Sequence, residues 1–329
     1  MLSVERVENI LPERIVVLEN PFAKNGHRGH RQLADLLDFS SLPFDTIQTS
    51  PDPSETAGRL GILEPTDLLY VIGGDGTNNS TIEPLMTSGA LTLPTRGGNA
   101  NDLAIAVNGY LSPWRVYSDY LEGDAHDPKV HPIEVTVTEE HGPTTQYNAN
   151  NYASIGYAAL ASHMLNQPLP EGYRRMLTAL PAQLRPLARI PLEGYRLLEA
   201  ARISQRFGCR VEDGESFEQA ADITVVHSER MAKLGRFNVR HFDGHVFSSV
   251  LEDGGMLAMG RQFVKMMRGK MAGENVIDRS FKIDNPSEHP LYLQVDGEAT
   301  PLPNSARVNF GLSEGHIRIL SAKLHDRAA

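Results

Sequence analysis

The chain has few of the features that mark secreted or membrane-embedded proteins. Cys209 is the only cysteine among 329 residues, so no internal disulfide can form and a reducing compartment is expected. No stretch approaches about 18 uninterrupted apolar residues, which predicts that nothing spans a bilayer. The opening residues, MLSVERVENILPER, carry charges throughout and lack the apolar centre of a signal peptide. A cytoplasmic location is the expectation.

Positive charge is also scarce. The formal net charge is −10, which argues against nucleic acid as the main partner. The hydrophobic content of 40% and the charged content of 22% are ordinary for a globular protein, and the length suits two domains. A Walker loop of the form GxxxxGK[ST] is absent, and GxGxxG fails because Asn79 stands where its last glycine belongs.

The most informative stretch is DLLYVIGGDGT, residues 67–77. Its apolar run is typical of a strand buried on both faces. Gly73, Gly74 and Gly76 then leave bare backbone, and glycine-rich backbone at a strand-to-helix passage binds phosphate through its N–H groups. Asp75 indicates a metal ion or water near those phosphates. The alternative is a tight turn that binds nothing.

A second glycine-rich stretch, TRGGNANDLAIAV, begins at Thr95. Gly97 and Gly98 clear space before a helix that starts near Asp102, and Asn99 or Asn101 could cap this helix. The helix dipole alone could explain an acid at that position.

A third stretch, LYLQVDGE, covers residues 291–298. Extended geometry would place Asp296 and Glu298 on one face, because side chains two residues apart along a strand share a face. Two neighbouring carboxylates would raise one pKa and leave a base with a partner. The alternative is a plain Asp-Gly turn after an edge strand.

These three stretches, in this order, resemble the diacylglycerol kinase and sphingosine kinase superfamily, which includes bacterial YegS-like lipid kinases. GGDGT followed by Asn79 resembles its nucleotide-binding loop, GGNANDLA its second element, and Asp-Gly-Glu its site of proton abstraction. NAD kinases share GGDGT, but GGNANDLA is similar to the lipid-kinase pattern. The sequence departs from the family at Ser80, where the family often has Glu, and at Asn99, where it usually has Thr.

The resemblance implies a set of site residues. Asp75, Asp296 and Glu298 would be catalytic, and Asp253 with the carbonyls of Val250 and Gly255 would hold Mg²⁺, for which oxygen ligands are preferred. ATP would contact a larger set, drawn from the glycine-rich stretches and from two loops nearer the N-terminus. That set is Asn20, Pro21, Lys24, Thr49, Gly73, Gly74, Asp75, Gly76, Thr77, Asn79, Gly98, Asn99, Asn101 and Asp102.

Strand and helix signals alternate up to about residue 125 and predict a doubly wound α/β nucleotide-binding domain over residues 1–128. Alternation of Ile133, Val135 and Val137 with polar residues then indicates an antiparallel domain, which the resemblance makes a β-sandwich over residues 129–312. The resemblance also implies that residues 313–329 return to the first domain.

Residues 171–210 carry eight arginines against three glutamates. A basic, partly apolar helical segment can lie on an anionic membrane, or its arginine stems can simply cover the second domain.

The sequence therefore predicts an ATP- and Mg²⁺-dependent lipid kinase that visits the membrane surface and phosphorylates a diacylglycerol-like or sphingoid alcohol. An enzyme like NAD kinase and a non-catalytic lipid- or nucleotide-binding protein remain the alternatives.

Overall fold

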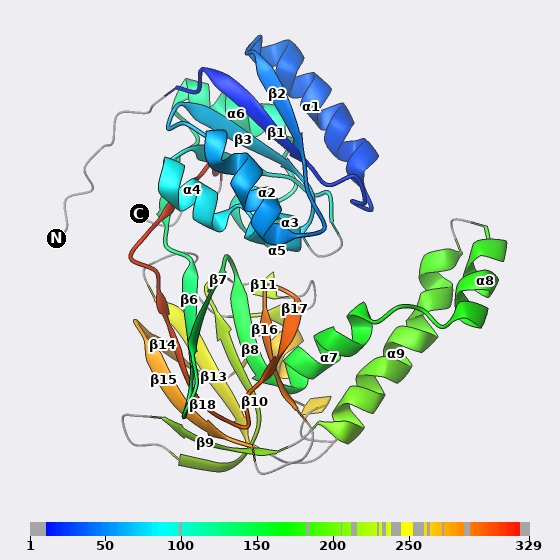
Figure 1. Cartoon of the computed structure of the whole chain (residues 1–329). Helices are drawn as coiled ribbons and strands as arrows, with labels where there is room; N and C mark the ends of the chain where they lie inside the picture. The colour runs from blue at the N-terminus through cyan, green and yellow to red at the C-terminus, as the bar shows by residue number, and fades with distance from the viewer. Residues whose placement is uncertain are drawn as a thin grey trace.

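The structure is a computed structural model of the chain, and it describes most residues between 11 and 322. The described ranges are 11–98, 101–181, 184–204, 206–211, 216–228, 230–231, 235–237, 245–252, 260–261, 264–271, 273–285 and 290–322. Two sheets hold most of the strands, and Figure 1 shows them one above the other.

The first sheet has six strands in the order β2-β1-β3-β4-β19-β5. All neighbours are parallel except β19 and β5. The strands are β1 (Arg14–Glu19), β2 (Phe44–Gln48), β3 (Asp67–Ile72), β4 (Leu91–Pro94), β5 (Lys129–Val130) and β19 (Ile317–Ile319). Every residue of β3 is buried, as its apolar run predicted.

Helices cover both faces of this sheet, which confirms the predicted doubly wound domain. One face packs against α1 (Gly26–Ser40) and α6 (Pro113–Glu122). The other packs against the short helix Leu60–Ile62, α4 (Ile82–Ser88) and α5 (Asp102–Asn108). Two further helices, α2 (Pro53–Arg59) and α3 (Asp75–Asn79), complete this part of the chain.

The second sheet is antiparallel and has 11 strands, which confirms the predicted class of the second domain. It is one continuous sheet that curls, so that side chains from strands far apart in its order share a single core. The strands are β6 (Ile133–Glu139), β7 (Thr144–Ala149), β8 (Tyr152–Gly156), β9 (Phe207–Val211), β10 (Ser216–Val226), β13 (Val246–Glu252), β14 (Glu274–Val276), β15 (Arg279–Asp284), β16 (Leu291–Val295), β17 (Glu298–Leu302) and β18 (Ser305–Leu312).

The passage from the first sheet to the second falls between Val130 and Ile133 rather than at residue 128, because β5 pairs with β19. The short strands β11 (Arg230–Met231) and β12 (Gly235–Arg236) pair only with each other among the described strands.

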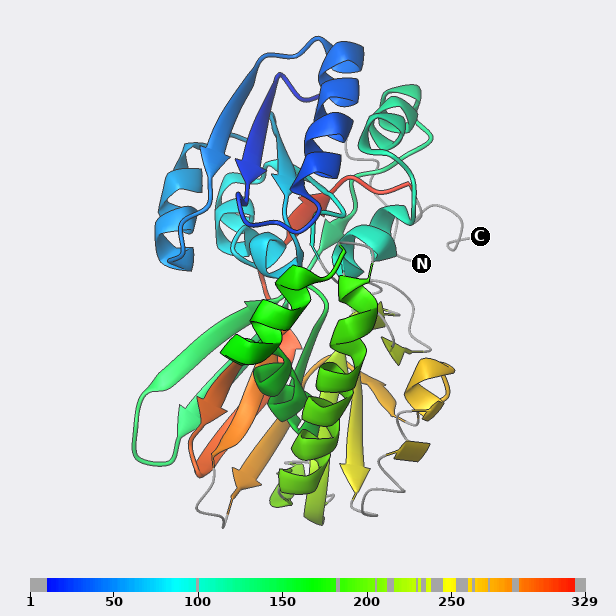
Figure 2. The same cartoon turned by 90° about the vertical axis from the view of Figure 1, so that its right-hand side faces the viewer.

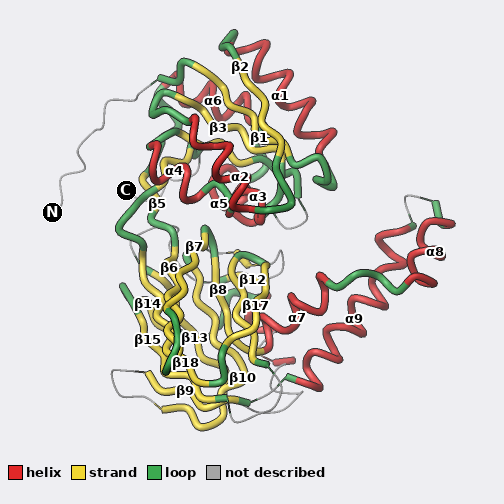
Figure 3. Tube along the Cα trace, viewed as in Figure 1, coloured by secondary structure: helices red, strands yellow, loops and turns green. Residues whose placement is uncertain are grey.

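Three helices form an arm on the second domain: α7 (Tyr157–Asn166), α8 (Glu171–Ala179) and α9 (Arg185–Ile203). Figure 1 shows α8 and α9 projecting away from both sheets, and Figure 2 views the arm from the side toward which it projects. In Figure 3 helices flank the upper sheet, whereas the helices of the lower part gather mainly in this arm. Among the described helices, none is both long and apolar enough to cross a membrane.

Candidate active site

The two glycine-rich loops lie directly against each other. A Cβ on Gly97 would lie 2.7 Å from the carbonyl oxygen of Gly73, and one on Gly98 would lie 2.3 Å from the Cα of Gly74. No side chain larger than hydrogen fits at such distances, so the backbones that follow β3 and β4 can meet only as glycine. Part of the glycine content therefore serves packing between the loops, beyond the phosphate contact that the sequence predicted.

Asp75, at the start of α3, ties these loops together. Its Oδ2 accepts the backbone N–H of Asn101 at 2.8 Å, and its Oδ1 accepts that of Leu103 at 3.4 Å. Burial, and next the charge of the fully buried Asp102, raise the pKa of Asp75 to about 6. The sequence indicated a metal ion or water near Asp75, and the structure shows that its carboxylate also holds the second loop.

The loop after β1 completes this edge of the first sheet. Asn20 donates from Nδ2 to Thr77 Oγ1 at 3.1 Å, and its own backbone N–H bonds Ile72. Thr49 lies beside it, since its N–H donates to the carbonyl of Glu19. Pro21 and Lys24 are exposed at the surface of the same loop. Asn99 lies outside the described residues.

Asn25 was missed in the sequence. Its side chain donates to the Gly98 carbonyl at 3.1 Å, and its backbone N–H donates to the Gly97 carbonyl at 3.0 Å. The residue joins the first loop to the second. Its position before Gly26 in a loop was the available signal, but its partners are more than seventy residues away.

Asp296 and Glu298 do not share an extended strand, so this expectation is wrong. Asp296 and Gly297 form the two-residue turn of a hairpin in which Val295 pairs with Glu298. Their φ angles are 45° and 97°, the left-handed values that such turns require. The chain reverses at this point, so the period-two rule does not apply to the two carboxylates.

The turn sends Asp296 inward. Its carboxylate accepts three backbone N–H groups where β7 turns into β8: those of Asn150 at 2.6 Å, Asn151 at 3.0 Å and Tyr152 at 3.1 Å. Burial, and to a smaller extent the charge of Asp75, raise the pKa of Asp296 to about 7, against the lowering effect of these hydrogen bonds. Asp296 therefore fixes the shape of this end of the second domain.

Glu298 turns outward, toward the first domain. A Cβ on Gly76 would lie 3.2 Å from Glu298 Oε1, so the carboxyl group stands directly over the glycine loop. The residue is exposed, yet partial burial of its carboxyl group raises its pKa. An acid from the second domain thus meets the loop in which the sequence predicted phosphate binding.

Asn79 spans the two domains from α3. In the amide orientation that satisfies its neighbours, its Nδ2 donates to the Asn148 carbonyl at 2.8 Å and lies 3.3 Å from Asp296 Oδ2. Its side chain thus joins the helix after the glycine loop to the turn before Glu298.

Helix α7 holds the same turn from the other side. Ser162 Oγ donates to the Gly297 carbonyl at 2.8 Å, and Asn166 Nδ2 donates to it at 3.0 Å. His163 stacks on Tyr292 of β16, with ring centroids 4.5 Å apart. None of these three residues was predicted, because nothing in the sequence places α7 beside β16.

The predicted Mg²⁺ ligands remain a prediction. Asp253 and Gly255 lie outside the described residues, and Val250 is a half-buried residue of β13 that packs against the core of the second sheet. Among the described residues, no group of three or more His, Cys, Asp or Glu side chains could hold a metal ion.

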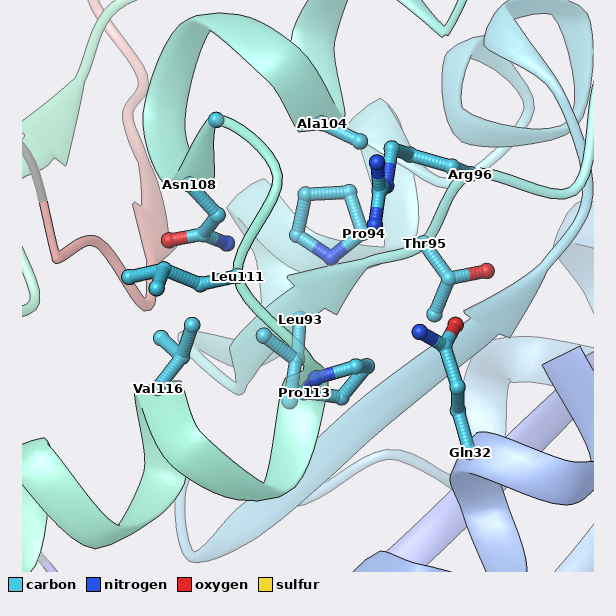
Figure 4. A pocket seen from close by; sticks show the side chains of 11 residues that line it. Gln32, Leu93, Pro94, Thr95, Arg96, Ala104, Asn108, Leu111, Pro113 and Val116 are labelled. Carbon is cyan, nitrogen blue, oxygen red and sulfur yellow. The ribbon is translucent and has the colours of Figure 1, made fainter.

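A small pocket opens beside the second glycine loop, between α1, α5 and α6 (Figure 4). It includes Thr95 and Arg96, which precede Gly97, but none of the predicted nucleotide-binding residues. Arg96 lies 5.0 Å from the centre of the Tyr110 ring.

Comparison with known proteins supports the fold. No family model and no curated protein matches the chain. Among solved structures, a diacylglycerol kinase from Bacillus anthracis is 17% identical, with a TM-score of 0.62, and the alignment covers 96% of this chain and 98% of that one. A second protein of that organism, provisionally assigned as a diacylglycerol kinase, has 16% identity, coverage of 94% and 97%, and a TM-score of 0.63.

Yeast NADH kinase is also similar, with 12% identity, coverage of 95% and 84%, and a TM-score of 0.51. These likenesses confirm the predicted fold class, an α/β domain followed by an antiparallel β domain, and the second domain is one curled sheet.

Proposed function

We propose that the chain is an ATP-dependent lipid kinase that phosphorylates the hydroxyl of a diacylglycerol-like or sphingoid alcohol. One observation carries the proposal: the carboxyl group of Glu298 stands over Gly76, with a Cβ-to-Oε1 separation of 3.2 Å. Phosphoryl transfer needs a phosphate cradle and a group that accepts the proton of the attacking hydroxyl, and these come from the two domains.

In this mechanism the loops around Gly74 and Gly98 hold the ATP phosphates, and Glu298 accepts the proton of the lipid hydroxyl as its oxygen attacks the γ-phosphorus in line. The raised pKa of Glu298 suits a general base. Asp296 holds the turn before Glu298 through its hydrogen bond from Asn150, and Asn79 joins α3 to that turn. Mg²⁺ bound with ATP would neutralise phosphate charge. Asp253 and the carbonyls of Val250 and Gly255 are the predicted ligands of a separate, structural Mg²⁺.

The first test is transfer of radiolabel from ATP to diacylglycerol, sphingosine, monoacylglycerol, phosphatidylglycerol and NAD. Labelling of a lipid alcohol supports the proposal. Labelling of NAD alone would favour an enzyme like NAD kinase, whose fold is shared. ATP binding without transfer to any acceptor would favour a non-catalytic protein.

Replacing Glu298 tests the base. Glu298→Gln keeps the size of the side chain but removes the basic site, so kcat should fall about 10²–10⁴-fold. The Kd for ATP should stay near that of the wild type, because the glycine loops are untouched. A folded Glu298→Gln protein with near-normal kcat would show that another group is the base, and Asp102 would be tested next.

A further inference from the structure

The outward face of α9 is an apolar stripe. Four large side chains along it are 47 to 63% exposed, and they are spaced three or four residues apart when Pro191 is included. On a helix this spacing places them on one face. We call this set the α9 stripe: Leu184, Leu187, Pro191, Tyr195 and Leu198.

The opposite face of α9 is already used. Ala200 is buried against Ala161 and Met164 of α7. Arg196 is buried too, and its guanidinium donates to the carbonyls of Leu165, Gln167 and Pro168 at 3.3, 2.9 and 2.8 Å. The α9 stripe therefore faces away from the contacts that hold the arm to the protein, and no described segment covers it.

Charge around the stripe is positive. The arm, residues 157–203, carries six arginines against three glutamates, a net +3, so the rest of the chain carries −13. The helical position that follows Leu198 on the stripe face is occupied by the exposed Arg202. Arg174 and Arg175 are exposed on α8, which contacts α9, and Arg175 pairs with Glu171. An apolar helix face with exposed arginines on its own helix and on the neighbouring one suits an anionic surface.

We infer that the α9 stripe docks the protein on an anionic lipid surface, with α9 lying along the interface. An isologous dimer through the stripe would bring two arms of +3 together, so charge disfavours a second copy as the occupant. The choice of lipid over other anionic surfaces rests on the proposed function. At about 1.5 Å per residue, the stripe is about 20 Å long.

The test is sedimentation of the full chain with vesicles of pure phosphatidylcholine or of phosphatidylcholine with phosphatidylglycerol. Wild type should bind only the anionic vesicles. Leu187→Ser with Leu198→Ser should weaken binding at least about tenfold. The matched control, Phe44→Ser with Ile62→Ser, removes two comparably exposed apolar side chains from the first domain and should bind like wild type.

Three single variants test the charges: Arg174→Ser, Arg175→Ser and Arg202→Ser. Each should weaken vesicle binding by up to about fivefold, and the binding that remains should depend less on salt than that of the wild type. Arg185 is left intact, because it donates to the carbonyls of Leu180 and Thr178 and so closes the end of α8.

Equal binding by wild type and the stripe variant, or a wild-type dimer that the stripe variant dissociates, would overturn the inference. Light scattering after size-exclusion chromatography measures the second outcome. Activity on a short-chain, water-soluble acceptor should survive in the stripe variant. Vesicle binding without any kinase activity would reject the proposed function and leave the docking surface standing.

Discussion

The two glycine loops approach so closely that one added methyl group would push them apart. Gly98→Ala would force a methyl group to within 2.3 Å of the Gly74 backbone, so the loops must separate. We expect a loss of about 1–3 kcal/mol in the free energy of unfolding, as for other overpacked sites, together with weaker ATP binding. Urea denaturation and ATP titration measure the two effects.

Gly58→Ala is the matched control for that substitution. Gly58 lies in α2, and a Cβ there meets nothing within 4 Å. Alanine should stabilise the protein by about 0.5–1 kcal/mol, since it restricts the unfolded chain. If Gly98→Ala is as harmless as Gly58→Ala, the two loops are not in contact.

The raised pKa of Asp296 implies that the free energy of unfolding depends on pH. Its pKa of about 7 in the folded protein exceeds the value of about 3.9 in an unfolded chain. Between these values the folded state binds more protons than the unfolded state, so the free energy of unfolding falls as pH rises from about 4 to 7. Urea denaturation at pH 5 and pH 7.5 should show a smaller fall for Asp296→Asn.

Asp35→Asn, at an exposed position of α1, is the matched control and should keep the wild-type dependence on pH. The same pH dependence in all three proteins would mean that Asp296 is ionised alike in the folded and unfolded states.

At the Asp-Gly-Glu sequence, the alternation of side chains along a strand no longer predicts where each residue lies. Leu291, Leu293 and Val295 lie in the core of the second sheet, and the strand β16 that they form ends at Val295. Asp296 could not be placed by the same rule, because the turn is defined by pairing with β17, and its three hydrogen-bond donors lie about 145 residues earlier.

At the scale of elements, α7 connects the arm to the proposed active site. Ser162→Ala with Asn166→Ala removes both donors to the Gly297 carbonyl, so the turn before Glu298 should be less firmly held. We expect kcat to fall about 5- to 20-fold, in the range of one or two lost hydrogen bonds, with little change in the Kd for ATP.

Two further variants separate positioning from stability. Ser162→Thr keeps the hydroxyl group and should retain most of the turnover. Thr178→Ala removes an exposed helical hydroxyl from α8 and should have no effect. An unchanged kcat in the folded double variant would show that α7 does not position Glu298.

The arm also shows what composition can and cannot predict about an element. The arginine-rich segment indicated helices with a basic surface, and its contact with a membrane stays a prediction. Arg196 is buried and braces the end of α7, whereas Arg202 remains exposed beside the α9 stripe. Sequence alone could not separate these arginines, because the difference lies in which face of α9 meets α7.

For the whole molecule, the order of motifs predicted the fold class well. Buried apolar runs ending in glycine mark parallel strands whose ends share one edge, and alternating residues mark an antiparallel domain. Only the resemblance to lipid kinases implied that Glu298 and Gly76 belong to one site, since no spacing rule connects positions that far apart. The hydrogen bond from Asn79 to the Asn148 carbonyl depends on how the two domains are placed, so nothing in the nearby sequence could predict it.

The place of β19 has a consequence for how the protein is made. This strand fills the gap between β4 and β5, and the Leu320 backbone N–H bonds the Thr92 carbonyl. A nascent chain on the ribosome therefore lacks one strand of its first sheet until the whole curled sheet has emerged. β19, which comes last in chain order among the described strands, closes the first layer, so the α/β domain is finished late in translation, although most of its residues are translated first.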